Sequence, residues 1–462
     1  MAGGMKSVNK VVVDGVTRLD LTKDSVTPQT LLVGATAHNA AGEQIEGSYV
    51  ASADVSEKDV NFFDYDGTLL YAWTLAETAG KTELPALPSH DGLICQRWNW
   101  TLEDIKALGR EVNVGANYIT DDGKTRLYIR VSDELASTVS LVFGQQFDRG
   151  VTVDWGDGSE PTTYSSDNNI VRQSHQYAVG NYVITLDPAD DCGMFLGRDG
   201  SGENVLGTIS TNRRAYSNML QKVEIGRNMT GIGIGAFAFN WCGQLQTITL
   251  PANIVSIKNN AFEGCSSLKA CIVPRYTGMQ ILAAAFYSCV NMRILSIPAT
   301  TVAFGSQALR MCRALRPLTI PDSITSFGTY TFTNNENADK IVIPDTVTSI
   351  GLAFADSCLT MTELVIGNGI TSIPANFAST CYALTRLTFP AGITSIAASA
   401  FANCRGVELY DFTACTAVPT LAATTAFTNI QSTCQIKVPA ALADEWKAAT
   451  NWANYADKIV GV

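Results

Sequence analysis

The sequence predicts a mainly β, multidomain protein in which small β modules and a β-sandwich precede a long repeat solenoid with a helical cap. Three observations predict this fold class. A block that begins with Phe or Leu recurs every 22 to 26 residues in the second half of the chain. Runs of alternating apolar and polar residues, separated by turn residues, mark short strands in the first half. The last 22 residues carry Trp and Tyr with helical spacing.

The composition is that of a folded chain with few surface charges. At 462 residues the chain is too long for one ordinary core, so several domains are expected. Apolar residues make up 46% and charged residues 16%, which excludes disorder. The net charge is -11 and no cluster of Lys and Arg occurs, so nucleic-acid binding is not expected. No apolar run approaches the roughly 20 residues that span a bilayer, so membrane insertion is not expected.

Residues 1–54 form the first predicted module. The N-terminus, MAGGMKSVNKVVVDG, lacks the apolar core of a signal peptide, so synthesis and folding in the bacterial cytoplasm are expected. The next segment resembles a short N-terminal module of tail and minor structural proteins of bacteriophages and prophages. That resemblance rests on Asp20, Leu21, Thr22, Val26, Thr27, Pro28, Leu31, Leu32, Gly34, Ala37, His38, Gly42, Ile45 and Gly47. It implies docking onto other virion tail or baseplate proteins, with a structural role for His38.

Residues 55–112 are predicted to form a small β-hairpin module. Its stretch NFFDYDGTLL, residues 61–70, looks like the nucleophile loop of haloacid-dehalogenase-type phosphatases, with Asp64 as nucleophile and Asp66 as acid and base. That family needs later βα units and acidic residues that hold magnesium, and the sequence supplies neither in the required places. Asp66-Gly67 between two strand-like runs indicates a hairpin instead. Both aspartates are therefore interpreted as turn residues, and changing both to Asn is expected to leave function largely intact.

Residues 113–200 are predicted to form a β-sandwich. The strand-like runs TRLYIRV and STVSLVF precede VTVDWGDGSEPTTY and SHQYAVGNYVITL. The WGDGS motif that begins at Trp155, followed by His175 and Tyr177, resembles domains of the polycystic-kidney-disease (PKD) type. The resemblance implies a spacer or adhesive module. In it the Asp-Gly pair forms a tight turn, Trp155 and Tyr177 fill the core, and His175 is structural.

Residues 201–440 are predicted to form a solenoid. Each repeat joins a bend with the pattern AFxxC to a short strand with the pattern LxxIxIP and to a second short segment such as ITSI. A single unit does not bury its apolar side, whereas stacked units bury Phe, Leu and Ile in one column. The blocks begin at Phe239, Phe262, Phe286, Leu309, Phe332, Phe354, Phe377, Phe401 and Phe427.

These repeats resemble leucine-rich repeats of the bacterial-surface-antigen (BspA-like) type over roughly residues 203–440. The block at Phe332 departs from the pattern, because Asn335 takes the Cys position and Ala338 takes the Leu position. We expect that repeat to be looser or locally bent. Residues 441–462, with Trp446, Trp452 and Tyr455, are predicted to form a helical cap over the last coil, and a partner-binding helix is the alternative.

Seven cysteines share one position of the repeat. A column of small buried thiols is the first interpretation and agrees with folding in a reducing cytoplasm. Disulfides between neighbouring coils are the alternative. No CxxC pair occurs, so neither a zinc ribbon nor a thioredoxin-like site is indicated. The seven are Cys242, Cys265, Cys289, Cys312, Cys358, Cys381 and Cys404.

No catalytic residue, metal ligand or cofactor is predicted, because the 3 scattered histidines do not assemble a Ser-His-Asp or Cys-His constellation. The resemblances imply a non-enzymatic virion protein, a phage tail fibre or receptor-binding component, whose repeats attach to a host surface protein or glycan. A homotrimer is the expectation by analogy with fibres. The alternative is a bacterial cell-surface adhesin that binds a host protein or glycan through the same repeats.

The candidate binding residues alternate with the apolar residues of the LxxIxIP strands, so the period-two rule points them outward. The row is uncharged in its first half and charged in its second. Charge reversals at the four charged positions are expected to weaken host binding without unfolding the protein. A solvated face without a partner is the alternative interpretation for any one residue. The row comprises Thr247, Thr249, Ala270, Ile272, Ile294, Ser296, Thr319, Lys340, Val342, Glu363, Val365, Arg386, Thr388 and Asp411.

Overall fold

The computed structural model describes most of the chain after residue 57 and short segments before it. The described residues are 10–13, 16–20, 36–38, 44–46, 58–132, 138–145, 149–165, 170–190, 192–197, 204–207, 218–226, 234–316 and 318–462. The chain divides into two compact units, residues 1–59 and residues 60–462.

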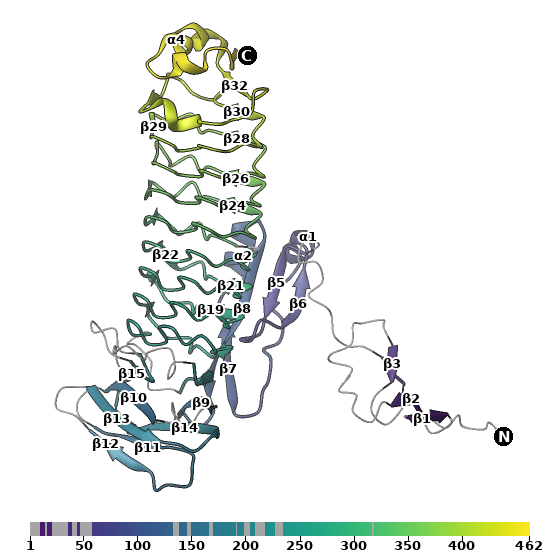
Figure 1. Ribbon diagram of the computed structural model, residues 1–462, viewed down its shortest axis with the longest axis vertical. Helices are drawn as coiled ribbons and strands as arrows, with labels where there is room; N and C mark the ends of the chain where they lie inside the picture. The colour runs from purple at the N-terminus through teal and green to yellow at the C-terminus, as the bar shows by residue number, and fades with distance from the viewer. Residues whose placement is uncertain are drawn as a thin grey trace. The chain divides into compact units, whose positions relative to one another are not determined.

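The first unit contains two described antiparallel strand pairs (Figure 1). They join β1 (Lys10–Val13) to β2 (Val16–Asp20) and β3 (Thr36–His38) to β4 (Gln44–Glu46). Most of the residues that resemble a phage tail module lie outside the described residues, and no side chain of this segment is described. Docking of this segment onto a virion therefore stays a prediction.

The second unit begins with a sheet of four strands, which we call, with its two helices, the four-stranded module (residues 60–120). The strand order is β6-β5-β8-β7, with β5 parallel to β8 and the other pairs antiparallel. Thr74 and Thr101 each close a capping box at the start of a helix. The elements are β5 (Val60–Phe63), β6 (Leu69–Trp73), α1 (Leu75–Ala79), β7 (Leu93–Trp98), α2 (Leu102–Leu108) and β8 (Val112–Thr120).

The expected hairpin is present, but the expected module boundary between residues 112 and 113 is wrong. β5 and β6 are joined by a turn in which the Asp64 backbone N–H donates to the Thr68 carbonyl at 2.8 Å. Gly67 takes the left-handed conformation that this turn requires, with φ of 89°. β8, which the sequence pattern assigns to the sandwich, pairs with β5 and β7, because its apolar side chains complete the core of this sheet.

Two antiparallel sheets follow, as the alternating pattern of residues 113–200 predicts. One has the order β13-β10-β15, and the other contains β12-β11-β14-β9. Trp155 and Tyr177 are buried as expected, and the Tyr177 hydroxyl donates to the Trp155 carbonyl at 2.8 Å. The strands are β9 (Thr125–Val131), β10 (Thr138–Gln145), β11 (Val151–Asp154), β12 (Thr162–Tyr164), β13 (Ile170–Gln176), β14 (Gly180–Pro188) and β15 (Met194–Leu196).

His175 has a structural role in this part of the protein. Its ring stacks on the Trp155 indole, with the centroids 4.6 Å apart, and its Nε2 lies 2.7 Å from a carboxylate oxygen of Asp157. Hydrogen bonds from Ser159 and His175 hold the pKa of Asp157 well below its usual range. The resemblance to PKD domains stays a prediction, since only the two sheets and this core are shown by the structure.

The sandwich and the solenoid share one sheet. β9 pairs antiparallel with β16 (Leu220–Glu224), and β16 pairs in parallel with β17 (Thr247–Ile248), the first strand of the repeats. One hydrophobic core therefore runs without a break from the sandwich to the last coil. The sandwich covers the open apolar end of the first coil, as a solenoid requires of its terminal units.

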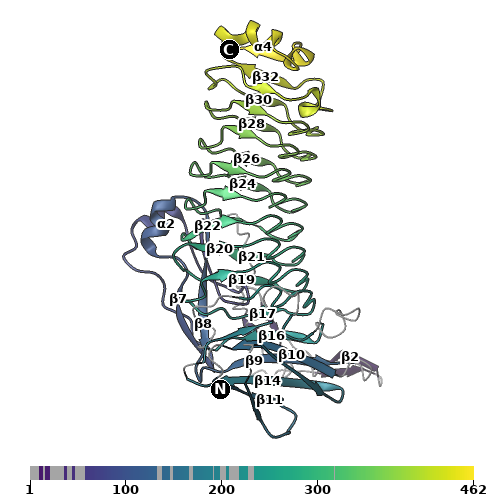
Figure 2. The ribbon, with the colours of Figure 1, turned by 90° about the vertical axis from the view of Figure 1, so that its left-hand side faces the viewer.

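The solenoid stacks its coils in register, in two rows of short parallel strands (Figures 1 and 2). The first row is the predicted LxxIxIP row, and the second row is the ITSI row. The first row comprises β17, β19 (Ala270–Ile272), β21 (Ile294–Ser296), β24 (Lys340–Val342), β26 (Glu363–Val365), β28 (Arg386–Thr388), β30 (Leu409–Asp411) and β32 (Gln435–Val438). The second comprises β18 (Ser256–Ile257), β20 (Met279–Ile281), β22 (Thr301–Phe304), β23 (Ser326–Phe327), β25 (Ser349–Ile350), β27 (Ser372–Ile373), β29 (Ser395–Ile396) and β31 (Thr420–Leu421).

Buried side chains of one kind form columns along the solenoid axis. The rings of Phe262 and Phe286 stack with an interplanar angle of 2°. The repeat cysteines are free buried thiols, which confirms packing over disulfides. Six of them donate the S–H to a backbone carbonyl of the preceding coil at 3.0 to 3.2 Å: Cys265, Cys289, Cys312, Cys358, Cys381 and Cys404. Burial raises the pKa of all six thiols.

The bend that carries AFxxC is built from left-handed residues, a feature that the sequence pattern does not reveal. Most coils have two non-glycine residues with φ between 52° and 62°, spaced four apart, such as Ala284 and Ser288 or Ser399 and Asn403. This conformation costs an L-residue roughly 1–2 kcal/mol. Packing of the columns therefore holds each bend against its local preference.

The C-terminal cap is shorter and more broken than one helix. It consists of α4 (Ala443–Ala448) between two 3₁₀ turns, followed by β33 (Ile459–Gly461), which adds a last strand beside β32. Trp446 and Trp452 are fully buried against Phe412, and this packing closes the last coil as predicted. None of the helices in the described residues is long and apolar enough to cross a membrane.

We predict that Asn335→Cys raises the free energy of unfolding by about 1 kcal/mol, because a buried amide is replaced by a thiol that can bind a carbonyl of the previous coil. Asn335 is 1% exposed and its Oδ1 has no hydrogen-bond partner. Urea denaturation followed by circular dichroism measures the change. Cys358→Asn is the reciprocal control and should lower stability. An unchanged or lower stability of Asn335→Cys would contradict the prediction.

Candidate binding face of the solenoid

The candidate binding residues lie on the first strand row, and we call the outward side of this row the strand face. In-register stacking aligns equivalent residues of successive coils, so that Ala270 lies beside Ile294 and Lys340 beside Glu363. A partner that contacts several coils would therefore meet columns of side chains rather than single residues. The environment of these columns changes along the solenoid.

The four-stranded module covers the first half of the strand face. β8 lies across β19 and β21, beside the lower coils in Figures 1 and 2. Phe63 and Leu69 of the module pack on Ala270, Ile272 and Ile294 in one apolar cluster. The alternate residues of these strands thus face outward from the coil, as predicted, but into a second layer of protein rather than into solvent.

Buried hydrogen bonds join the two layers. The Asn99 side-chain amide donates to the Val273 carbonyl at 2.8 Å and to the Ser296 hydroxyl at 2.9 Å. The Ser296 hydroxyl also lies 2.5 Å from the Asn113 carbonyl, and the Thr319 hydroxyl donates to the Glu111 carbonyl at 3.0 Å. Separating the layers would break these bonds and expose their donors and acceptors to water.

Ion pairs surround this interface. Arg275 of the solenoid pairs with Asp104 of the module at 3.0 Å, and Arg110 of the module pairs with Asp322 of the solenoid at 2.7 Å. Exposed pairs of this kind add roughly 0–1 kcal/mol each, so the apolar layer and the buried amides hold the module in place.

The first half of the predicted binding row is therefore corrected. Thr247 is half-buried, and the remaining residues in this part of the row are buried: Thr249, Ala270, Ile272, Ile294, Ser296 and Thr319. Their lack of charge is explained by this burial, since a layer inside the protein does not accommodate unpaired charges. From Ala270 to Thr319 these residues contact the four-stranded module and are not open to a partner. Thr249 instead accepts the Ile225 backbone N–H at 3.0 Å.

The second half of the row is open to solvent. Lys340, Glu363, Val365, Arg386 and Thr388 are exposed. Val342 is half-buried, and Asp411 is 8% exposed. We call the strand face from β24 to β30 the open strand face.

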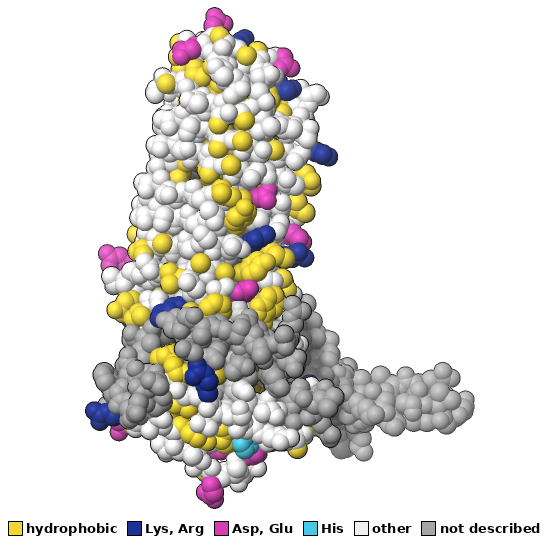
Figure 3. All heavy atoms as spheres, turned by 60° about the vertical axis from the view of Figure 1, so that its left-hand side comes forward, with side chains coloured by type: hydrophobic (Ala, Val, Ile, Leu, Met, Phe, Trp, Pro, Cys, Tyr) yellow, Lys and Arg dark blue, Asp and Glu magenta, His cyan; other side chains and the backbone are white. Residues whose placement is uncertain are grey.

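Charges on the open strand face are paired between coils. Lys340 and Glu363 lie 3.0 Å apart, and Arg386 and Asp411 lie 2.6 Å apart. Burial raises the pKa of Asp411, but hydrogen bonds from Thr413 and Arg386 outweigh it and keep this pKa below its usual range. Elsewhere the solenoid shows mostly uncharged and hydrophobic side chains with isolated charges, as the side presented in Figure 3 illustrates.

The interpretation of Asp64 as a turn residue is incomplete, because its carboxylate also binds residues outside the turn. Asp66 fits that interpretation, since its carboxylate accepts the Thr68 backbone N–H at 2.8 Å. Asp64 is 4% exposed, accepts the Tyr118 hydroxyl at 2.7 Å and lies 2.6 Å from His90 Nε2. The cluster ties the hairpin tip to β8 and to the loop before β7. Sequence reasoning missed His90, because 26 residues separate it from Asp64 and no motif links them.

The chemistry available around Asp64 is limited by burial. Cys95 lies near the cluster, but burial raises its pKa to about 11, so the thiol is protonated at neutral pH. Among the described residues, no group of three His, Cys, Asp or Glu side chains has an arrangement that could hold a metal ion. We interpret the cluster as a structural contact, because Asp64 joins the hairpin tip to Tyr118 of β8 and to His90.

Comparison with known proteins identifies the repeat type. Residues 206–280 and 279–408 match the family model for the BspA type leucine rich repeat region, with six copies. The match confirms the resemblance of the repeats and the predicted solenoid. It does not extend to the N-terminal segment or to the sandwich. No curated protein sequence shows a significant match to the chain.

Several solved structures resemble the chain at low identity. A leucine rich cell surface protein from Faecalibacterium prausnitzii shares 18% identity, with a TM-score of 0.28, over 60% of this chain and 88% of that chain. A leucine-rich repeat protein from Bacteroides ovatus shares 15% identity, with a TM-score of 0.23, over 53% of this chain and 84% of that chain. A leucine rich repeat protein of T. pallidum shares 20% identity, with a TM-score of 0.25, over 35% and 67%.

We predict that Asp64→Asn lowers the free energy of unfolding by about 1–3 kcal/mol, because a buried carboxylate that binds Tyr118 and His90 is replaced. Asp66→Asn is the matched control and should change stability by less than about 0.5 kcal/mol. Urea denaturation of both variants tests this. Equal effects of the two substitutions would show that Asp64 is a turn residue only.

We predict that Gly115→Val releases the four-stranded module from the strand face. A Cβ atom at residue 115 would lie 2.4 Å from side-chain carbons of Ile272, inside a sheet that pairs on both sides of β8. Hydrogen exchange at β19 and β21 should rise strongly. In the control, Gly392→Val, the new Cβ would meet only ordinary contact at 3.9 Å and exchange should not change. Unchanged protection in Gly115→Val would contradict the role of this close contact.

Proposed function

We propose that the protein is a non-enzymatic cell-surface adhesin that binds a partner protein through the open strand face. The observation that supports the proposal is that the strand face changes from covered to exposed at Lys340. Before this residue the strand face is covered by the four-stranded module, and after it the same face is exposed and carries charges. The four-stranded module thus covers uncharged residues of the strand face and leaves the charged residues available.

The chemistry of the open strand face suits a protein partner. Alternating Lys340, Glu363 and Arg386 present both signs of charge along the axis, and Val365, which is 39% exposed, supplies apolar area between them. Apolar area within a rim of paired charges is the usual composition of a protein–protein interface. The exposed positions of this row include no aromatic side chain, so we favour a protein over a glycan.

The repeat family favours the adhesin over the virion protein that the N-terminal resemblance suggests. The BspA type match lies on the repeats that form the open strand face. A virion protein has no support beyond the N-terminal resemblance, so that hypothesis ranks second. Immunolabelling of intact, prophage-free cells of the source bacterium separates the two: surface labelling supports the adhesin, and labelling confined to virions contradicts it.

We predict that exchanging the partners of one ion pair, Lys340→Glu with Glu363→Lys, weakens partner binding at least about tenfold without unfolding the protein. The exchange keeps opposite charges in contact, and an exposed pair contributes little to stability. Binding to immobilised extracellular-matrix proteins, with a glycan array in parallel, is measured for the full chain.

The matched control exchanges Arg313 and Glu336, an exposed pair 3.3 Å apart that lies outside the strand face. Its binding should equal that of the unmodified protein. Equal binding by both exchanged variants, or an equal loss in both, would contradict the open strand face as the binding site. Binding to glycans alone would contradict a protein partner.

A further inference from the structure

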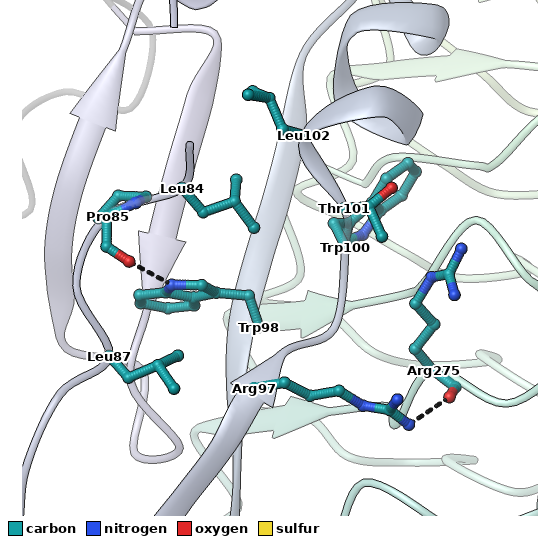
Figure 4. A pocket seen from close by; sticks show the side chains of 9 residues that line it. All are labelled: Leu84, Pro85, Leu87, Arg97, Trp98, Trp100, Thr101, Leu102 and Arg275. Atoms are coloured by element: carbon teal, nitrogen blue, oxygen red, sulfur yellow. Dashed lines mark hydrogen bonds between the residues drawn. The ribbon is translucent and has the colours of Figure 1, made fainter. Parts of the chain in front are cut away.

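A pocket lies where the four-stranded module meets the solenoid. Its volume is about 400 Å³. The module contributes Leu84, Leu87, Trp98 and Trp100, and the solenoid contributes Arg275. Figure 4 shows Leu84, Leu87 and Trp98 on one side of the pocket and Trp100 with Arg275 on the other. None of the residues that line the pocket belongs to the open strand face.

One wall of the pocket is a fixed aromatic surface. The Trp98 Nε1–H donates to the Pro85 carbonyl at 2.9 Å, which holds the indole ring in place. Leu84 flanks this ring, and Leu87, which is 45% exposed, lies at the opening to solvent. A flat apolar group is the shape that such a wall accommodates best, since aromatic rings prefer offset or edge contacts with other rings.

The pocket also carries an excess of positive charge. Arg275 pairs with Asp104, but Arg97 donates only to the backbone carbonyls of Ala252 and Arg275. Among the described residues no carboxylate pairs with Arg97. Burial and the nearby Arg275 lower the pKa of Arg97. Two guanidinium groups therefore face a single carboxylate, which favours an anion beside Arg97.

We propose that this pocket binds a small organic anion that has one flat apolar ring and one carboxylate. The ring packs on Trp98 between Leu84 and Leu87. The carboxylate lies toward Arg97. A neutral ligand of the same shape would fill the apolar wall and leave Arg97 without a counter-ion, and a cation would be repelled by both arginines.

Three probes of one shape test the charge requirement. Isothermal titration of the full chain with 4-phenylbutyrate, 4-phenylbutanamide and 4-phenylbutan-1-amine compares an anion, a neutral amide and a cation. We expect 4-phenylbutyrate to bind at least about tenfold more tightly than the amide, and the amine not to bind. No binding of 4-phenylbutyrate at millimolar concentration, or equal binding of the acid and the amide, overturns the proposal.

Variants locate the site. Arg97→Gln keeps a side-chain donor for the carbonyls of Ala252 and Arg275 and removes the positive charge, so the protein should stay folded and bind 4-phenylbutyrate several-fold more weakly. Leu87→Asp places a negative charge at the opening and should abolish binding. Leu352→Asp is the matched control, because Leu352 is an exposed leucine (38%) that does not line the pocket. Unchanged binding in Arg97→Gln, or equal losses in the two aspartate variants, overturns the proposal.

Discussion

Stacking of one coil on the next is the interaction on which the rest of the structure depends. A single coil leaves its phenylalanine and its cysteine thiol exposed on both sides, and only the neighbouring coils cover them. The gain from this burial also holds two left-handed residues in most bends. A stack of this kind always has two open ends, and both ends of this solenoid are closed by folded structure.

The two ends are closed in different ways. At the first coil the closure continues a sheet, since β9 of the sandwich pairs with β16, and β16 with β17. At the last coil Trp446 and Trp452 pack over Phe412. The strand face, on the side of the stack, is covered only in part. The four-stranded module covers it as far as Thr319. The extent of that cover decides which coils are available to a partner.

The repeats were predictable from the sequence because their order is local and periodic. Spacing alone places the strands, the Phe column, the Cys column and the outward residues of the row. The packing of the four-stranded module on the strand face was not predictable, because its contacts join residues far apart in sequence without any motif. Asn99 binds Ser296 across 197 residues, and Arg110 binds Ile320 across 210. The uncharged first half of the row is the one sign of the cover that the sequence contains. The pairing of β8 was not predictable either, because its pattern of apolar residues is compatible with both neighbouring sheets.

The thiol column has a consequence for the protein's behaviour in different redox environments. All seven of these sulfurs are buried, and six of them bind a carbonyl of the coil before them. Burial raises the pKa of the thiols, which keeps them protonated at neutral pH. Oxidants and disulfides react with thiolates, so these cysteines do not react while the coils remain stacked. The thiol column therefore keeps the same covalent structure in a reducing and in an oxidising environment.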